Sequence, residues 1–251
     1  MADCATSGIV YPSNFLKHRM KTINVARRFC GPASSSNGGY FAGLVARLES
    51  DTLAVRILKP PPLETELAIV ERDGGVIEVR QGETLVGEAR HTELKLELPA
   101  APTYFEAVEA SRRYTGFHSH RFPTCFVCGT QRPRGDGMRV FAGRIPERNI
   151  VAAPWVPDTS LDQGDGKVRP EFMSAALDCP GYYAITEDDR MMLLGELTVH
   201  LDRLVHIDES CTVIGWSIGS DGRKHEAGTA IFDEDGEVCG RGRAVWIEPR
   251  N

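Results

Sequence analysis

Hydrophobic and polar positions alternate along two long stretches of the chain, which predicts two sets of antiparallel β-strands. In "LAVRILKPPPLETEL" and in "LTVHLDRLVHIDESC" an alternating pattern runs into a short irregular break and then into a second strand. The two segments align without gaps at an offset of 144 residues (197 − 53), so that Leu53 matches Leu197 and Val55 matches Val199. The sequence therefore indicates an internal repeat.

Both copies of the repeat end in a hairpin of similar sequence. The segments "GETLVGEAR" and "DGEVCGRGR" align so that Gly87 matches Gly240. Asp-Gly pairs are typical of the tight turns that join such strands. Turns are predicted at Asp73-Gly74, Asp221-Gly222 and Asp235-Gly236.

A segment rich in small residues precedes each copy and is typical of a helix. The first is "NGGYFAGLVARLE" (37–49), and the second is "PEFMSAALDCPGYYAI" (170–185), which starts with a proline suited to a first helical position. Pro180 should kink or end the second helix. Each half is thus interpreted as one helix followed by several strands, and a sheet curling around an apolar helix would bury it. The predicted fold class is α+β.

Composition excludes several classes of function. The 251 residues carry a net charge of −6 and no basic run, which argues against binding of nucleic acid. Since no apolar run approaches about 18 residues, we expect no membrane span, and the N-terminus lacks the apolar core of a signal peptide. The seven cysteines, an odd number, suit reduced thiols in a cytoplasmic protein.

Three stretches resemble acyl-coenzyme A thioesterases of the hotdog fold, in a fused double-hotdog form. "SNGGYFAGLVAR" is similar to the glycine-led start of a hotdog central helix. "CFVCGTQRPRGDGMRVFAG" is similar to a strand-opening Cys-x-x-Cys-Gly segment, and "RPEFMSAALDCPGYYAI" to a hotdog helix that retains an acid. The resemblance implies a first hotdog unit over 31–100 and a second over 124–251. An N-terminal extension (1–30) and a linker with a mixed helical pattern (101–123) complete the predicted organisation.

The family resemblance also implies an activity. It predicts hydrolysis of acyl-CoA-type thioesters in fatty acid metabolism, without a cofactor, at a site shared between two units. One unit would supply an acid on its central helix, and the other would offer backbone N–H groups at the start of its own helix. A homo-oligomer of the fused pair is possible.

Asp178 is the candidate acid. It is the one charge in the apolar stretch 172–186, and a buried carboxylate is costly unless it is paired or used. When the helix starts are aligned, Gly39 against Glu171 (171 − 39 = 132), Asp178 falls opposite Ala46, so that only the second half keeps a carboxylate. We therefore expect one working site and one vestigial site in each chain.

The start of the first helix is the candidate oxyanion donor. Gly38 and Gly39 leave backbone N–H groups accessible, whereas Pro170 in the second helix has none to offer. Asp178 would activate water or attack the thioester carbon through an anhydride, and both routes stay open. The N–H of Gly39 would hold the oxyanion, and Asn37 would orient water or the carbonyl.

The predicted substrate contacts surround this pair. Small residues one helical turn before Asp178 leave room beside the carboxylate, and aromatic residues suggest an apolar tunnel. The predicted substrate-binding residues are Gly38, Ser174, Ala175, Tyr182 and Tyr40. Lys59 and Arg203 occupy matched positions at strand ends and are candidates to meet coenzyme A phosphates.

Structural alternatives accompany each of these assignments. Asp178 has the position of a helix N-cap before Pro180, Asn37 also suits an N-cap, and the glycines suit a tight helix entry. Cys125 and Cys128 have the spacing of half a zinc site, but no second Cys-x-x-Cys exists, so that buried thiols at a strand start are favoured and no metal is predicted.

Three other functions remain open. The first is a hotdog hydratase or dehydratase, which would need a histidine beside the acid, and His200 is the candidate. A thioesterase with Cys179 as its nucleophile is disfavoured, because Cys179 has no histidine in sequence reach. The others are a non-catalytic acyl-CoA binding protein and a structural assembly subunit, since fold alone does not fix function.

Overall fold

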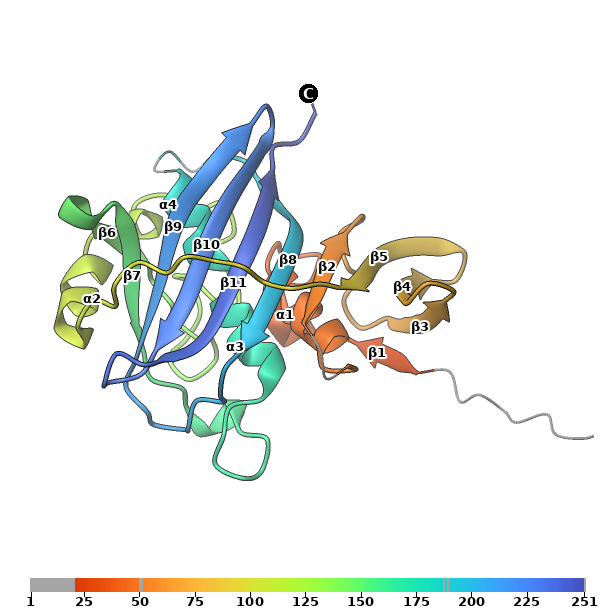
Figure 1. Cartoon of the computed structure of the whole chain (residues 1–251), viewed down its shortest axis with the longest axis horizontal. Helices are drawn as coiled ribbons and strands as arrows, with labels where there is room; N and C mark the ends of the chain where they lie inside the picture. Colours follow the sequence, from red (N-terminus) through yellow and green to blue (C-terminus); the bar gives the residue numbers. More distant parts are fainter. Residues whose placement is uncertain (1–20, 50–51, 187, 189, 251) are drawn as a thin grey trace, which may run out of the picture.

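One continuous antiparallel sheet forms the frame of the molecule. The computed structural model describes residues 21–49, 52–186, 188 and 190–250. Eleven strands follow the order β1-β3-β4-β5-β2-β8-β11-β10-β9-β7-β6 (Figure 1). Their bounds are β1 Thr22–Asn24, β2 Leu53–Ile57, β3 Glu66–Arg72, β4 Val76–Gln81, β5 Thr84–His91, β6 Gly143–Ile145, β7 Ile150–Trp155, β8 Leu193–Leu201, β9 Cys211–Asp221, β10 Lys224–Phe232 and β11 Val238–Ile247.

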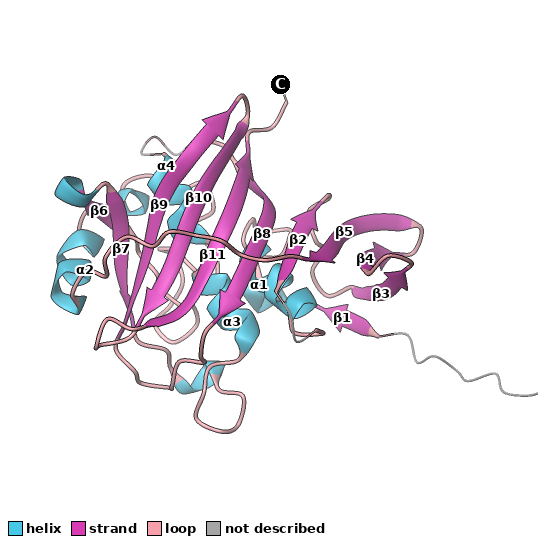
Figure 2. Cartoon of the chain, in the orientation of Figure 1, coloured by secondary structure: helices cyan, strands magenta, loops and turns pink. Residues whose placement is uncertain are grey.

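Short helices cover one face of this sheet. Figure 2 shows α1, α3 and α4 behind the strands, where α1 packs against α3 and α4 packs against β9 and β10. The α-helices are α1 Gly38–Ala46, α2 Tyr104–Ser111, α3 Pro170–Ala176 and α4 Cys179–Ile185, and the 3₁₀ turns are η1 Arg27–Phe29, η2 Thr115–Phe117, η3 Pro146–Arg148 and η4 Thr159–Leu161. Within the described ranges, no helix combines the length and apolar character needed to cross a membrane.

The pairing of β2 with β8 joins two halves that have the same strand order. Outward from this seam run β2-β5-β4-β3-β1 on one side and β8-β11-β10-β9-β7 on the other. At the seam Leu53 lies opposite Val199, Val55 opposite Leu197, and Ala54 opposite Thr198. Since Leu53 faces the counterpart of Val55, Val55 faces the counterpart of Leu53 and Ala54 faces its own counterpart, the seam has local two-fold symmetry. The internal repeat predicted from the sequence is thus present in the topology.

The hairpins also follow the predicted repeat. Gly87 in β5 lies opposite Ile57, and Gly240 in β11 lies opposite Leu201, so that the aligned glycines occupy equivalent register positions. The Asp-Gly turns join β3 to β4, β9 to β10, and β10 to β11. Their glycines adopt positive φ angles of 81°, 56° and 81°, which glycine tolerates without steric cost, at Gly74, Gly222 and Gly236.

The helical stretch of the second half is broken in two, as Pro180 predicts. Proline lacks an N–H, and its ring clashes with the carbonyl four residues earlier. The break falls at Leu177 and Asp178, and Pro180 enters the first turn of α4. The interruption places Asp178 at a junction between two helices and not on a regular helix face.

Three segments differ from the sequence-based interpretation. The expected N-terminal extension contains β1, which pairs with β3 and so belongs to the sheet. The expected linker contains α2, which begins with a Thr103–Glu106 capping box and packs against β7. The Cys-x-x-Cys-Gly segment does not open a strand, because residues 125–142 form turns and loops before β6 starts at Gly143.

Two apolar clusters form the core of the molecule. The larger cluster lies between the sheet and α1, α3 and α4. The smaller cluster lies on the other face, where Ala107 and Ala110 of α2 meet Ile150 of β7 and Ala230 of β10. The segment that follows β5 crosses this second face (Figure 1) and packs Leu98 against it. Helices α1, α3 and α4 therefore lie on one face of the sheet, and α2 lies on the other.

Candidate functional site

Asp178 lies where α3 crosses the start of α1. Although it occupies the N-cap position of α4, its side chain forms no capping hydrogen bond there. Its Oδ2 instead accepts hydrogen bonds from Asn37 Nδ2 at 2.7 Å and from the backbone N–H of Gly39 at 2.9 Å. Among the residues that the structure describes, Oδ1 has no hydrogen-bond partner. One carboxyl oxygen is thus fixed by two donors, and the other is buried without a partner.

Asn37 has both of the roles considered for it. Its Oδ1 accepts a hydrogen bond from the backbone N–H of Tyr40 at 2.8 Å, which caps the N-terminus of α1. The amide Nδ2 of the same side chain donates to Asp178. The cap fixes the orientation of the side-chain amide, so that Nδ2 is directed at the carboxylate.

Glycine at position 39 is required by the close approach of the two helices. A Cβ atom there would lie 2.5 Å from Asp178 Cβ and 2.7 Å from the backbone oxygen of Ser174. One turn further along α1, a Cβ at Gly43 would lie 2.6 Å from Glu171 Cα. Without side chains at these positions, the backbone of α1 comes close enough for its N–H to reach Asp178.

Burial dominates the electrostatics of Asp178. The side chain is about 2% exposed, and the loss of solvation raises the pKa of its carboxyl to about 7. Hydrogen bonds from Gly39 and Asn37 act in the opposite direction and favour the ionised form, which lowers the pKa. Raised pKa values of this kind are frequent among catalytic acids and bases.

A cavity of about 480 Å³ opens beside Asp178. Asn37, Gly38 and Asp178 line it at one point, and Leu194 and Trp246 contribute apolar surface elsewhere. The exposed cationic residues Lys59, Arg121 and Arg223 also line it. The cavity therefore combines an apolar interior with positive charge near solvent.

The predicted substrate contacts divide into two groups. Gly38 and Tyr182 line the cavity. Ser174 and Ala175 instead lie under Gly39 in the helix crossing, outside the cavity lining, because the helices approach too closely to leave room there. Tyr40 also lies outside the lining: its ring stacks on Phe29 at 4.3 Å in the core.

The expected oxyanion donor and one of the expected phosphate contacts have other partners in the structure. The N–H of Gly39, expected to face the substrate, donates to Asp178. As the first residue of α1, Gly38 carries an N–H that has no acceptor within the helix, and Gly38 lines the cavity. Arg203 forms ion pairs with Glu209 and Asp233, away from the cavity, whereas Lys59 lines the cavity.

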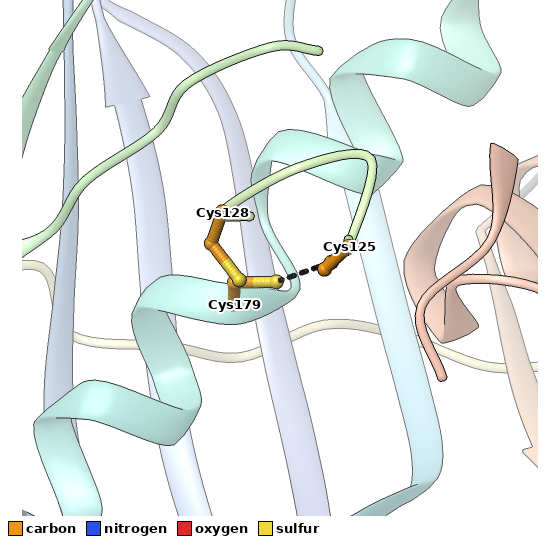
Figure 3. A group of neighbouring side chains, drawn as sticks. All are labelled: Cys125, Cys128 and Cys179. Atoms are coloured by element: carbon orange, nitrogen blue, oxygen red, sulfur yellow. Dashed lines mark hydrogen bonds between the residues drawn. The ribbon is translucent and has the colours of Figure 1, made fainter. Parts of the chain in front are cut away.

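Three thiols gather beside the carboxyl group. Cys125 and Cys128 come from the loop that covers the helix junction, and Cys179 is the first residue of α4 (Figure 3). Hydrogen bonds from the thiols of Cys128 and Cys179 lower the pKa of Cys125. Burial raises the pKa of Cys128, and the hydrogen bonds with Cys125 and Cys128 raise that of Cys179. The sequence analysis missed this cluster, although Cys179 directly follows the candidate acid.

The histidines are distributed differently from the sequence-based expectation. His200, the candidate for a hydratase, hydrogen bonds to Thr52 Oγ1 at 3.0 Å and lies outside the cavity lining. His120 lines the cavity, where Nε2 lies 2.9 Å from the backbone oxygen of Cys128 and 3.3 Å from the hydroxyl of Tyr183. The interpretation as a hydratase thus loses the histidine on which it depended.

The contact between α1 and α3 has two ends, which are the two crossings related by the repeat: the first holds Asp178 and Asn37, and the second holds an ion pair. At the start of α3, Glu171 is about 1% exposed and accepts a hydrogen bond from Arg47, which follows α1, at 2.8 Å. Arg169 lies 3.3 Å from the same carboxylate oxygen. The two crossings, related by the repeat, therefore carry different groups.

Comparisons with known proteins identify the fold. No family model matches the sequence, and no match is found among curated proteins. Solved structures do match over nearly the whole chain. The tesB protein of Mycobacterium avium subspecies paratuberculosis aligns with 91% of this chain and 92% of its own, at a TM-score of 0.60 and 14% identity. This chain has a hotdog fold.

Two more hotdog structures agree with this result. A protein described as an oleoyl thioesterase from Lactobacillus plantarum aligns with 92% of this chain and 96% of its own, at a TM-score of 0.55 and 11% identity. A protein described as thioesterase II from Thermobifida fusca aligns with 91% of this chain and 93% of its own, at a TM-score of 0.56 and 14% identity. At such identities the matches establish the hotdog fold, and the chemistry must be argued from the site itself.

Proposed function

We propose that this hotdog protein hydrolyses acyl-CoA-type thioesters at the crossing of α1 and α3, with Asp178 as general base or nucleophile. The observation that carries the proposal is the state of its carboxyl group. Oδ2 is held by Asn37 and Gly39, and Oδ1 has no partner among the described residues, in a side chain that lines a cavity of about 480 Å³. A buried carboxyl group fixed at one oxygen is preorganised to react through the other.

Two routes use the same geometry. In the first, Oδ1 takes a proton from water, the water oxygen attacks the thioester carbon, and the C–S bond breaks as the thiolate recovers the proton from Asp178. In the second, Oδ1 itself attacks the carbon and expels the thiolate, which is protonated by solvent, and water then hydrolyses the mixed anhydride. Both routes give a carboxylic acid and a free thiol.

The start of α1 supports the negative charge that develops on the carbonyl oxygen. We assign this role to the N–H of Gly38, because Gly38 lines the cavity and the N–H of Gly39 is bonded to Asp178. The positive end of the α1 dipole acts in the same direction. Asn37 holds the acid in place and caps the helix that supplies the donor.

The cavity suits both ends of an acyl-CoA molecule. Leu194, Tyr182 and Trp246 offer apolar surface for an acyl chain. Lys59, Arg121 and Arg223 offer positive charge near solvent for phosphate groups. We assign the cavity to the substrate because it joins an apolar surface to positive charge near solvent.

The strand order supports a double-hotdog arrangement with one catalytic site in each chain. We propose a first unit that extends from β1 to β5 around α1, and a second unit that extends from α2 to β11 around α3 and α4. The proposed site takes Asp178 from the second unit and Asn37 and Gly38 from the first. The other crossing holds the ion pair of Arg47 and Glu171, and we assign no catalysis to it.

The test is a panel of short-chain, long-chain and aromatic acyl-CoA thioesters, assayed by release of the free thiol. Asp178→Asn should lower kcat/KM about 10²- to 10⁴-fold for every accepted substrate, because it removes the base but keeps the shape. The control is Glu171→Gln, which alters another buried carboxylate of the helix crossing outside the cavity lining. Its turnover per folded molecule should stay within a few-fold of wild type.

Other results would favour the alternatives. Normal turnover by Asp178→Asn would remove Asp178 from the mechanism. Tight binding of acyl-CoA without thiol release from any substrate would indicate a binding protein. Hydration of an enoyl thioester would indicate a hydratase, in which His120 would then be the histidine to substitute.

A further inference from the structure

The three-cysteine cluster, Cys125, Cys128 and Cys179, has the chemistry of a metal site. The three Sγ atoms lie within 4.8 Å of one another (Figure 3). All three side chains are more than nine-tenths buried, and all three line the cavity. A metal ion would therefore reach the sulfurs through the cavity without opening the core.

The spacing of the sulfurs agrees with tetrahedral zinc. A Zn–S bond length of about 2.3 Å places two sulfurs of a tetrahedron about 3.8 Å apart. Cys125 Sγ and Cys179 Sγ are 3.9 Å apart. The largest separation in the cluster, at most 4.8 Å, requires side-chain adjustments of about 1 Å or less.

The loop that carries Cys125 and Cys128 presents its sulfurs by a tight turn. The N–H of Gly129 donates to the carbonyl oxygen of Cys125 at 2.9 Å. A Cβ at Gly129 would lie 2.4 Å from that oxygen, so the turn requires glycine. Cysteine binds metals as the thiolate.

Asn37 connects this cluster to the candidate active site. Its Nδ2, which donates to Asp178, also lies 3.9 Å from Cys125 Sγ and 4.0 Å from Cys179 Sγ. The amide thus offers a further positive dipole to two of the sulfurs. A metal bound here would share its surroundings with the reacting groups.

A second group of potential ligands provides a contrast. Glu209, Asp233 and Cys239 also gather within 4.8 Å. The guanidinium group of Arg203 forms ion pairs with both carboxylates, so that their negative charge is already balanced without a metal ion. In the three-cysteine cluster, the hydrogen bonds of the sulfurs within the described residues involve Asn37 and the thiols themselves, and none involves a cationic side chain.

We propose that Cys125, Cys128 and Cys179 bind one Zn²⁺ ion as thiolates, with the fourth coordination position facing the cavity. Binding releases three protons to solvent, and three thiolates on one Zn²⁺ carry a net charge of −1. Three protein ligands with an open fourth position are typical of zinc sites that exchange ligands, whereas structural sites are closed by a fourth residue. The inference goes beyond the proposed hydrolysis and does not depend on it.

The test measures metal directly. Protein purified with reductant from zinc-supplemented cells should contain about one zinc ion per chain by elemental analysis. Cys125→Ala, Cys128→Ala and Cys179→Ala should each lose at least about 90% of it under the same conditions. Cys239→Ala, which removes a buried thiol outside the three-cysteine cluster, should retain it. None of these readouts requires catalysis, so they separate this inference from the proposed function.

Cobalt supplies a second measurement that does not rely on the variants folding. Chelator-treated, reduced wild-type protein titrated with Co²⁺ should show thiolate-to-cobalt charge-transfer absorption and tetrahedral visible bands, saturating at one ion per chain. The same titration of Cys179→Ala should give a weaker charge-transfer band. Zinc-free protein without a cobalt spectrum, zinc content unchanged in the three cysteine variants, or a disulfide forming in place of metal uptake would each overturn the proposal.

Discussion

Gly39→Ala tests the geometry on which the site depends. The added Cβ would lie 2.5 Å from Asp178 Cβ, which is 0.9 Å short of the 3.4 Å at which ordinary contact begins. The opposing atoms belong to the α3 backbone and to a Cβ, neither of which can rotate away. If the helices separate by this amount, the 2.9 Å hydrogen bond from Gly39 to Asp178 lengthens to about 3.8 Å and is lost.

The expected cost follows from three contributions. Overpacking of this kind costs about 1–3 kcal/mol, and loss of a buried hydrogen bond adds about 1–3 kcal/mol. The higher helix propensity of alanine returns about 1 kcal/mol. We therefore expect the free energy of unfolding to fall by about 1–5 kcal/mol, and Tm by roughly 10 °C at the middle of that range. Hydrolysis per folded molecule should fall as well, because Asp178 loses one of its two hydrogen-bond donors.

Gly38→Ala is the matched stability control in the same helical turn. Its Cβ would meet Leu194 Cδ2 at 2.7 Å and Ile57 Cδ1 at 3.3 Å, which are ends of side chains that can move, and Leu194 Cβ at 3.1 Å, which is a smaller overlap than the one at Gly39. Urea unfolding of both variants should show a loss in Gly38→Ala of less than about 1 kcal/mol. Equal losses in the two variants, or no loss in Gly39→Ala, would refute the inferred close approach of α1 and α3.

Three further variants test individual contacts. Asn37→Ser keeps a helix cap but removes the donor to Asp178, so it should retain most of the stability and lose turnover. Asn37→Ala removes both the cap and the donor, so it should also lose about 1 kcal/mol of stability. Unfolding and thiol-release assays on the same samples measure the two effects. Arg47→Gln should lower the free energy of unfolding by about 2 kcal/mol, because buried Glu171 loses one of its two arginine partners, and a cost near zero would mean that the pair is dispensable. Burial raises the pKa of Tyr40 from 10.0 to about 12. The stabilising contribution of the protonated hydroxyl is therefore complete below about pH 10 and declines toward about pH 12. Between about pH 9 and about pH 11, the free energy of unfolding measured in urea should decline less for Tyr40→Phe than for wild type.

The repeat made much of the architecture predictable. Because Leu53 and Val55 match Leu197 and Val199, the sequence already indicated two equivalent strand sets, and the seam pairs these residues reciprocally. Asp178 was identifiable because a charge within an apolar stretch is costly to bury unless it is paired or used. That it would face the start of the first helix was implied by the family resemblance, and the structure places it beside Asn37.

Features that depend on distances were not predictable. Whether the N–H of Gly39 faces a substrate or Asp178 is decided by how closely two helices cross, which no local pattern records. The segment 125–142 has no strand or helix periodicity, so the meeting of Cys125 with Cys179 depends on how a loop folds over a helix junction. Ser174 and Ala175 were expected to leave space, and the opposite helix fills that space.

The ion pair of Arg47 and Glu171 illustrates what covalent fusion of two similar units allows. In a homodimer, symmetry forces both crossings to carry the same residues, so that a change that strengthens one interface alters both catalytic centres. In a single chain each crossing evolves separately. One crossing can then hold a stabilising ion pair while the other keeps a buried carboxylate with an unpaired oxygen, and under the proposed function the chain would process one substrate at a time.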